Sequence, residues 1–228
     1  MSQEHIGPGR RAGRPLETVL SKERITRAAL RLIATDGYGN FTMASLAKSL
    51  VVAPSALYNH AASKTVVLQW LQDHVMTMVD VTGFGSEAWD AAVRRWAWSY
   101  RDIFAMHAPL ISIVAVLPVT GAPQTLRMYE TVAAGLANAG LPAEQIVPAI
   151  VALESFIFGS AFDVNAPADI FDTAGLAEYS PTFSIAVQLQ RAEDGRTRAD
   201  IAFQFGLDAL LAHIDAGRTP GTPGKSAP

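Results

Sequence analysis

Apolar residues recur three and four positions apart along most of this 228-residue chain, which is the spacing of one face of an α-helix. The first such run begins after Ser21, a suitable N-cap, and continues from Ile25 through Ile33 to Gly37, a suitable C-cap. The sequence has no run of alternating apolar and polar residues typical of strands, and no internal repeat. The pattern therefore predicts an all-α protein.

Short helices follow the first one. We expect a second helix to open at Thr42 and a third to cover residues 55–59, because residues 51–53 interrupt the pattern between them. Ser63 is a suitable N-cap for a fourth helix, which the apolar positions extend to about Asp80. Two short helices joined by a tight break form a helix-turn-helix, in which the second helix can enter the major groove of DNA.

The rest of the chain predicts longer helices separated by glycine and proline. These helices are expected over about 87–107, 109–116, 123–139, 143–164 and 197–215. Residues 165–195 are harder to interpret, and short helices over 168–178 and 182–192 are the candidates there.

Composition excludes several classes of protein. Half of the residues are apolar and 17% are charged, which excludes a disordered chain and indicates a large core or a subunit interface. The chain has no cysteine, so it has no disulfide, thiolate metal site or cysteine nucleophile. The histidines contain no pair spaced i,i+4, and we expect neither a metal site nor a cofactor. They are His5, His60, His74, His107 and His213.

Two apolar stretches bear on the location of the protein. Residues 109–118 are too short to span a bilayer, and residues 146–162 carry Glu154 at their middle. Residues 1–14 are polar and basic and lack the apolar run of a signal peptide. We therefore expect a soluble, cytoplasmic protein without a membrane partner.

Charge is distributed unevenly along the chain. Residues 1–64 hold nine basic and four acidic residues, a net charge of +5, whereas residues 65–228 hold nine basic and seventeen acidic residues, a net charge of −8. A basic N-terminal module on an acidic remainder is typical of a DNA-binding domain joined to a domain with another role. Chance clustering on a solvated surface is the alternative.

The predicted helix-turn-helix supplies candidate DNA contacts. Small side chains at Ser55 and Ala56 let the backbone approach the bases, and Tyr58 and His60 offer a hydroxyl and a ring N–H. Lys64, in the first turn of the next helix, forms an anion site together with the free backbone N–H groups there. The candidate DNA-binding residues are Arg10, Arg11, Arg14, Thr42, Ser55, Ala56, Tyr58, Asn59, His60 and Lys64.

The three arginines lie in a segment rich in glycine and proline, so residues 1–20 are expected to form a flexible basic arm. Such an arm follows the DNA backbone or enters the minor groove, unless it is simply a solubilising tail.

The stretch from Ser21 to about Leu71 resembles the DNA-binding domain of the TetR family of bacterial transcriptional repressors. The resemblance is carried by Arg14-Pro15, residues 25–37, Phe41-Thr42, Leu46-Ala47, residues 55–60 and Ser63-Lys64. It implies a three-helix DNA-binding head on a larger helical body that dimerises and binds a small molecule. The expected organisation is an arm over 1–20, a helix-turn-helix domain over 21–66, a ligand-binding and dimerisation domain over 67–216, and a disordered tail over 217–228.

Three positions depart from the family pattern. Val51 stands in the turn where the family usually has glycine, and a β-branched residue resists a positive φ, so the turn is either built differently or strained. Ala61 replaces an aromatic residue after His60, and Ala44 replaces a residue that can read a base. Ser55, Ala56 and Asn59 are therefore the expected base readers.

Aromatic residues gather in the predicted body. They recur at helical spacing in residues 87–107, which is usual for a core and is also compatible with the wall of a cavity. The candidate ligand-binding residues are Trp96, Tyr100, Phe104, His107, Tyr129, Glu154, Phe158 and Phe162. Glu154 has three possible roles: a salt bridge across an interface, a contact to a polar group of a ligand, or a place on an exposed stripe.

These observations favour a dimeric, ligand-responsive DNA-binding regulator. Helices over about 143–164 and 197–215 are the candidate homodimer contacts, and two-fold symmetry would match a palindromic operator. The effector is expected to be hydrophobic or aromatic, and the protein to be a repressor. A helical interaction module with no specific DNA binding is the first alternative, and a helical enzyme is the second. An enzyme is not expected, because the sequence has no Gly-rich phosphate loop and no nucleophile elbow.

Overall fold

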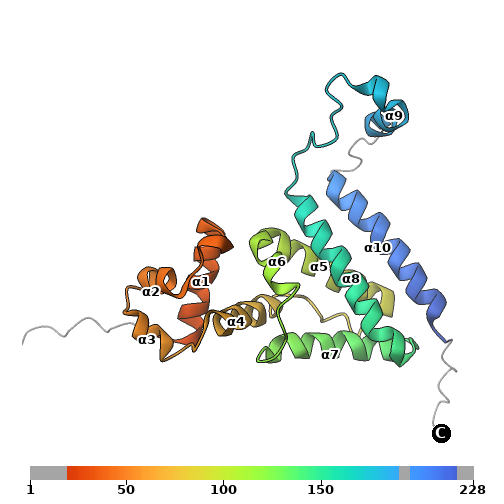
Figure 1. The fold of residues 1–228 in the computed structure, drawn as a ribbon. Helices are drawn as coiled ribbons and strands as arrows, with labels where there is room; N and C mark the ends of the chain where they lie inside the picture. The colour runs from red at the N-terminus through yellow and green to blue at the C-terminus, as the bar shows by residue number, and fades with distance from the viewer. Residues whose placement is uncertain (1–19, 190–195, 220–228) are drawn as a thin grey trace, which may run out of the picture.

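The computed structural model describes residues 20–189 and 196–219 (Figure 1). Every regular element in these residues is a helix, which confirms the all-α prediction. The predicted basic arm and most of the predicted tail lie outside the described residues. The division into four segments stays a prediction.

The N-terminal head consists of α1 (Lys22–Asp36), a short 3₁₀ helix (Tyr38–Asn40), α2 (Met43–Leu50) and α3 (Pro54–Tyr58). The predicted caps are present: the Ser21 side chain accepts the N–H of Arg24, and Thr42 forms a capping box with Ser45. Apolar side chains pack together in the interior of the head. Those with no more than 1% exposure are Ile25, Ala29, Ile33, Phe41, Leu46, Ala47 and Leu57.

Helix α4 (Lys64–Met76) leads from the head, where it contacts α1, into the body, where it contacts α7. The sequence pattern extended this helix to Asp80, and that prediction is wrong. Residues 77–79 form turns, in which the N–H groups of Thr77, Met78 and Val79 bond to carbonyls three positions earlier. The Asp80 N–H then bonds to the Ser99 hydroxyl at 2.9 Å and the Asp80 carboxylate accepts the Thr82 N–H at 2.9 Å, so the helix does not resume and the loop begins.

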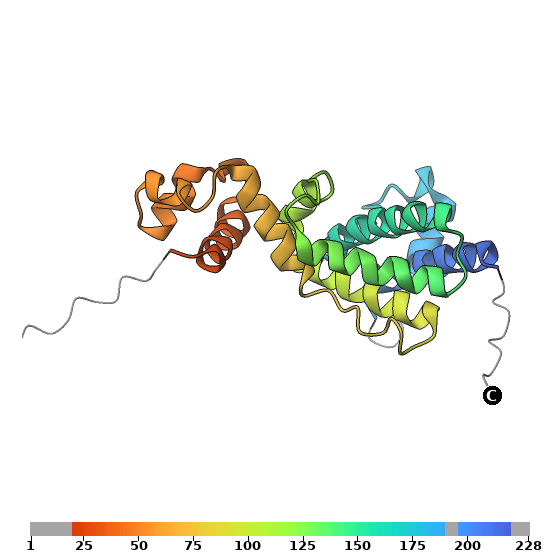
Figure 2. The same cartoon turned by 90° about the horizontal axis from the view of Figure 1, so that it is seen from below.

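The body is a bundle of long helices with one short helix (Figures 1 and 2). The long helices are α5 (Trp89–Met106), α7 (Pro123–Asn138), α8 (Ala143–Val164) and α10 (Arg198–Gly217), and the short one is α6 (Ile111–Val114). Helix α8 packs against α5, α7 and α10, and the aromatic stripe of α5 lies inside the bundle. The helix predicted over 109–116 is shorter than expected, because Ala108–Leu110 form a 3₁₀ turn before α6.

The segment between α8 and α10 stands away from the bundle (Figure 1). The α-helix predicted over 168–178 is wrong: Ala174 and Gly175 have φ of 46° and 87°, and the Asp172 carboxylate accepts the Ala174 N–H, which makes a turn. A 3₁₀ helix (Ala177–Tyr179) and α9 (Pro181–Leu189) follow. Helix α9 confirms the start of the helix predicted over 182–192, whose last residues are outside the described range.

Candidate nucleic-acid interface and ligand cavity

Helix α3 presents most of its predicted DNA contacts to solvent. It has five residues, and Leu57 alone among them is fully buried, which fastens α3 to the core of the head. Ser55 and Tyr58 on the helix, and Asn59 just after it, are exposed, and Ala56 is partly buried. His60 follows on the same exposed segment. The geometry brings the predicted contacts of this helix together on an accessible surface.

The turn between α2 and α3 has the tight geometry for which glycine is usual. Val51 adopts the left-handed conformation, with φ 57° and ψ 47°, and is 90% exposed. The Val52 N–H returns to the carbonyl of Ala47 at 3.1 Å and closes the end of α2. Of the two alternatives for this turn, strain is therefore the correct one. A left-handed non-glycine residue costs about 1–2 kcal/mol.

Lys64 lies at the start of α4, where the Ser63 side chain caps the helix by accepting the Val66 N–H. Its ammonium is 4.2 Å from the centre of the Tyr38 ring and 5.3 Å from that of Phe41. Cation–π contact holds the charge beside the free N–H groups of the first helical turn. This arrangement is suited to a phosphate.

Tyr38, which positions Lys64, is not among the residues predicted from the sequence. An aromatic residue directly after the glycine that ends α1 was the available signal, but nothing local links it to a lysine 26 positions later. Thr42 is exposed at the start of α2, and its hydroxyl is engaged with Ser45 at 3.0 Å. Arg10, Arg11 and Arg14 lie outside the described residues.

Four of the predicted ligand contacts form one aromatic cluster. The centres of the Tyr100, Phe104 and Phe158 rings are 5.1–5.5 Å apart, and Trp96 lies 5.6 Å from Tyr100. Trp96, Tyr100 and Phe104 are fully buried, and Phe158 is partly buried. These rings fill the interior between α5 and α8 and fix the position of the polar group beside them.

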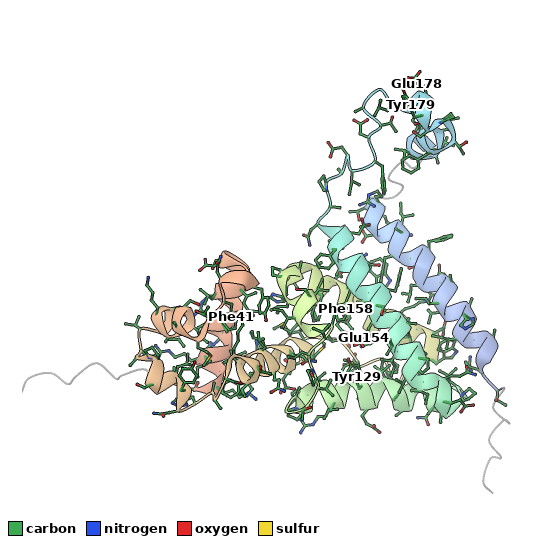
Figure 3. All side chains as sticks on the ribbon, in the orientation of Figure 1. Phe41, Tyr129, Glu154, Phe158, Glu178 and Tyr179 are labelled. Atoms are coloured by element: carbon green, nitrogen blue, oxygen red, sulfur yellow. The ribbon has the colours of Figure 1, made fainter. Side chains whose placement is uncertain are left out.

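That polar group is Glu154, which is partly buried between α5, α7 and α8. Its Oε1 accepts the hydroxyl protons of Tyr100 at 2.9 Å and Tyr129 at 2.8 Å. Figure 3 shows Tyr129, Glu154 and Phe158 close to one another. Burial raises the pKa of Glu154 and the two hydroxyl donors oppose that rise, while burial and the nearby carboxylate raise the pKa of both tyrosines.

Glu154 and Tyr129 line a cavity of about 360 Å³ between α7 and α8. The other residues of its wall are Leu126, Glu130, Ala133, Ile146, Val147, Ile150 and Val151. A volume of this size is in the range of small-molecule sites. Glu154 is hydrogen-bonded within the chain and also lines this cavity, and its contact to a ligand stays a prediction.

Two predicted ligand contacts lie elsewhere. Phe162 is 52% exposed near the end of α8, and His107 follows α5, where burial lowers its pKa and nearby His74 lowers it further. Neither residue lines the cavity beside Glu154. Within residues 20–189 and 196–219, no three histidine or acidic side chains gather as a metal site requires.

Two family models match the chain. The model of the bacterial regulatory proteins of the tetR family matches residues 25–69, and that of the Tetracyclin repressor-like C-terminal domain matches residues 84–217. The tetracycline repressor protein class E of Escherichia coli is 23% identical over 200 residues, which cover 86% of this chain and 92% of that protein.

Solved structures agree with the fold. The TetR family protein ActR of Streptomyces coelicolor, in complex with (S)-DNPA, matches with a TM-score of 0.72 at 23% identity, over 89% of this chain and 100% of that chain. BioQ of Mycobacterium smegmatis, with its double-stranded DNA operator, matches with a TM-score of 0.63 at 22% identity, over 87% and 99%. The family models span the head and nearly the whole body, and the chain therefore belongs to the TetR family of bacterial transcriptional regulators.

Proposed function

We propose that this regulator is a dimeric repressor that binds a palindromic operator through α3 and leaves it when a small effector occupies the body. The observation that carries the proposal is the exposed face of α3, held by Leu57 and followed by Lys64 at the start of α4. Ser55, Ala56 and Asn59 read bases, and Tyr58, His60 and Lys64 bind phosphates. The relative solved on its operator supports this assignment.

Helices α8 and α10 form the homodimer contact in this proposal. Phe162 on α8 is 52% exposed and Phe205 on α10 is 80% exposed, and neither lines the cavity beside Glu154. By length and composition α8 could also cross a membrane, but its packing on α5 and α10 is that of a bundle helix. A second copy of the chain would remove these apolar side chains from water. The site of action is the cytoplasm, where the DNA lies.

Hydrogen bonds between α4 and α7 connect the helix that leads from the head to a helix that lines the cavity. The carboxylate of Asp73, buried on α4, accepts the N–H groups of Gln124 at 2.6 Å and Thr125 at 3.1 Å, at the start of α7. Helix α7 also supplies Tyr129 to the cavity wall. An effector that binds better to one position of α7 therefore favours one position of α4 and of the head.

The test is binding of the full chain to the DNA that flanks its own gene, measured by fluorescence anisotropy over a series of salt concentrations. Lys64→Ala should weaken binding about tenfold and lower the salt slope by about one phosphate contact. Arg31→Ala is the matched control, because Arg31 is an exposed cation of α1 outside the proposed interface. Equal effects of the two variants, or binding without sequence preference, would contradict the proposal and favour an interaction module.

A further inference from the structure

The cavity between α7 and α8 has an unusual balance of charge. Six of its nine wall residues are aliphatic and one is Tyr129; the other two, Glu130 and Glu154, are acidic, and none is basic. An apolar wall binds the hydrocarbon part of a ligand without regard to charge. The two carboxylates, in contrast, repel an anion and attract a cation.

The carboxylate of Glu154 keeps hydrogen-bonding capacity for a ligand. Two hydroxyl protons reach it, and both make their shorter contact with Oε1, at 2.9 and 2.8 Å. Tyr129 also lies 3.1 Å from Oε2, but one proton cannot serve both oxygens fully. Oε2 therefore retains lone pairs for a further donor.

Glu154 also lacks a counter-charge. Among the residues that the structure describes, none forms an ion pair with it, and its partners are the neutral hydroxyls of Tyr100 and Tyr129. A partly buried carboxylate without a cation is stabilised by a ligand that brings one. The Tyr100 ring, which supplies one of the two hydroxyls, packs against the Phe104 and Phe158 rings.

We infer that this cavity binds an organic monocation, an amine with an aromatic or aliphatic body, whose ammonium group donates to Glu154. The body of the ligand lies against the aliphatic side chains of α7 and α8. The inference rests on the proposed function, since it names the chemical class of the effector that acts on the repressor. It narrows the sequence-based expectation of a hydrophobic or aromatic effector.

The test uses three probes with one naphthalene body and different head groups: naphthylmethylamine, naphthylmethanol and naphthoate. Calorimetry at neutral pH with the full chain should give the amine an affinity at least about tenfold above that of the alcohol, with the acid weaker still. Glu154→Gln should lower the affinity of the amine about tenfold and leave that of the alcohol within about twofold. Glu144→Gln is the matched control, because Glu144 lies on α8 and does not line this cavity.

The inference is overturned if the alcohol or the acid binds as tightly as the amine, if the amine does not bind, or if Glu154→Gln leaves its affinity unchanged. The comparison of the three probes on the unmodified chain needs no variant, so poor folding of Glu154→Gln cannot hide the result. Operator binding is measured in parallel without probe. Intact operator binding with no preference for the amine refutes the inference alone, whereas a preference for the amine without any operator binding refutes the proposed function alone.

Discussion

The head and the body differ in the hydrogen bonds that their buried and partly buried polar side chains make. Among the described residues of the head, Thr26 is the buried polar side chain, and it donates to the Lys22 carbonyl of its own helix at 2.8 Å. In the body, Asp73, Arg101 and Glu154 each join one helix to another. The head is thus held by apolar packing, local caps and the hydrogen bond of the Arg24 side chain to the Leu50 carbonyl at 3.1 Å. In the body, the apolar core is supplemented by polar links between helices that a ligand or a proton can alter.

The largest effect is expected from the apolar core of the head. Leu57→Ala removes a fully buried side chain that holds α3, and should lower the free energy of unfolding by about 3 kcal/mol and abolish operator binding. Urea unfolding and anisotropy measure the two effects. Met106→Ala, at a side chain that is 70% exposed in the body, should change stability by less than about 0.5 kcal/mol. Similar losses for both variants would contradict the account of the head.

The next effect concerns a polar link of the body. The Arg101 guanidinium, 5% exposed, pairs with Asp200 of α10 at 2.7 Å and lies over the Trp98 and Phe203 rings. Arg101→Ala should lower the free energy of unfolding by about 2 kcal/mol, because it leaves Asp200 without its partner and opens the packing of α5 on α10.

Arg95→Ala is the control for Arg101→Ala on the same helix. Its side chain is 47% exposed and pairs with Glu87 and Asp80 at the surface, so Arg95→Ala should lower the free energy of unfolding much less than Arg101→Ala does. Urea unfolding of both variants measures the difference. If Arg95→Ala lowers the free energy of unfolding as much as Arg101→Ala does, burial does not make the Arg101 ion pair contribute more to stability than the exposed Arg95 pair.

Val51 gives a stabilising prediction in the head. Val51→Gly should raise the free energy of unfolding by about 1 kcal/mol, because glycine takes the left-handed conformation without strain and the exposed valine gives up little contact. Thermal unfolding measures the change, and Val51→Ala should give a smaller one. A lower melting temperature for Val51→Gly would show that the valine is held by favourable contacts instead.

The smallest effect is a pH dependence in the body. The pKa of Glu154 is raised in the folded chain above its usual 4.5, so the folded state binds this proton more tightly than the unfolded state does. Protonation of Glu154 therefore stabilises the folded chain fully at a pH below the pKa that Glu154 has in the unfolded chain. This stabilisation is lost as the pH rises through the pKa that Glu154 has in the folded chain. Glu154→Gln removes this dependence, and the difference in melting temperature between variant and wild type should therefore change in favour of the variant as the pH rises. A difference that is constant with pH would contradict the raised pKa.

Much of the head could be predicted from the sequence, because its signals are local. Ser21, Thr42 and Ser63 act as caps where the pattern placed them, and the short helices that it predicted around Leu46 and Leu57 are present. The end of α4 was missed because the Ser99 hydroxyl, nineteen positions away, binds the Asp80 N–H. The spacing of apolar residues along α4 gives no information about a contact with a residue of α5.

The site around the cavity was harder to predict from the sequence than the head, because its contacts join residues that are far apart in the chain. The sequence marked Tyr100, Tyr129 and Glu154 as separate candidates, but not that both hydroxyls bind one carboxylate across 54 and 25 positions. The aromatic stripe of α5 was ambiguous between core and cavity wall, since both are apolar. Only the packing of α5 against α8 places Trp96 and Phe104 in the core and leaves Tyr129 and Glu154 at the cavity.

Operator recognition as proposed requires that paired copies of α3 lie in successive major grooves of one operator. Hydroxyl-radical footprinting of the full chain on the DNA that flanks its own gene measures this arrangement. We expect two symmetric half-sites with centres about one helical turn, or 34–36 Å, apart, and loss of protection with Leu57→Ala. Protection without two-fold symmetry, or protection that Leu57→Ala leaves intact, would contradict it.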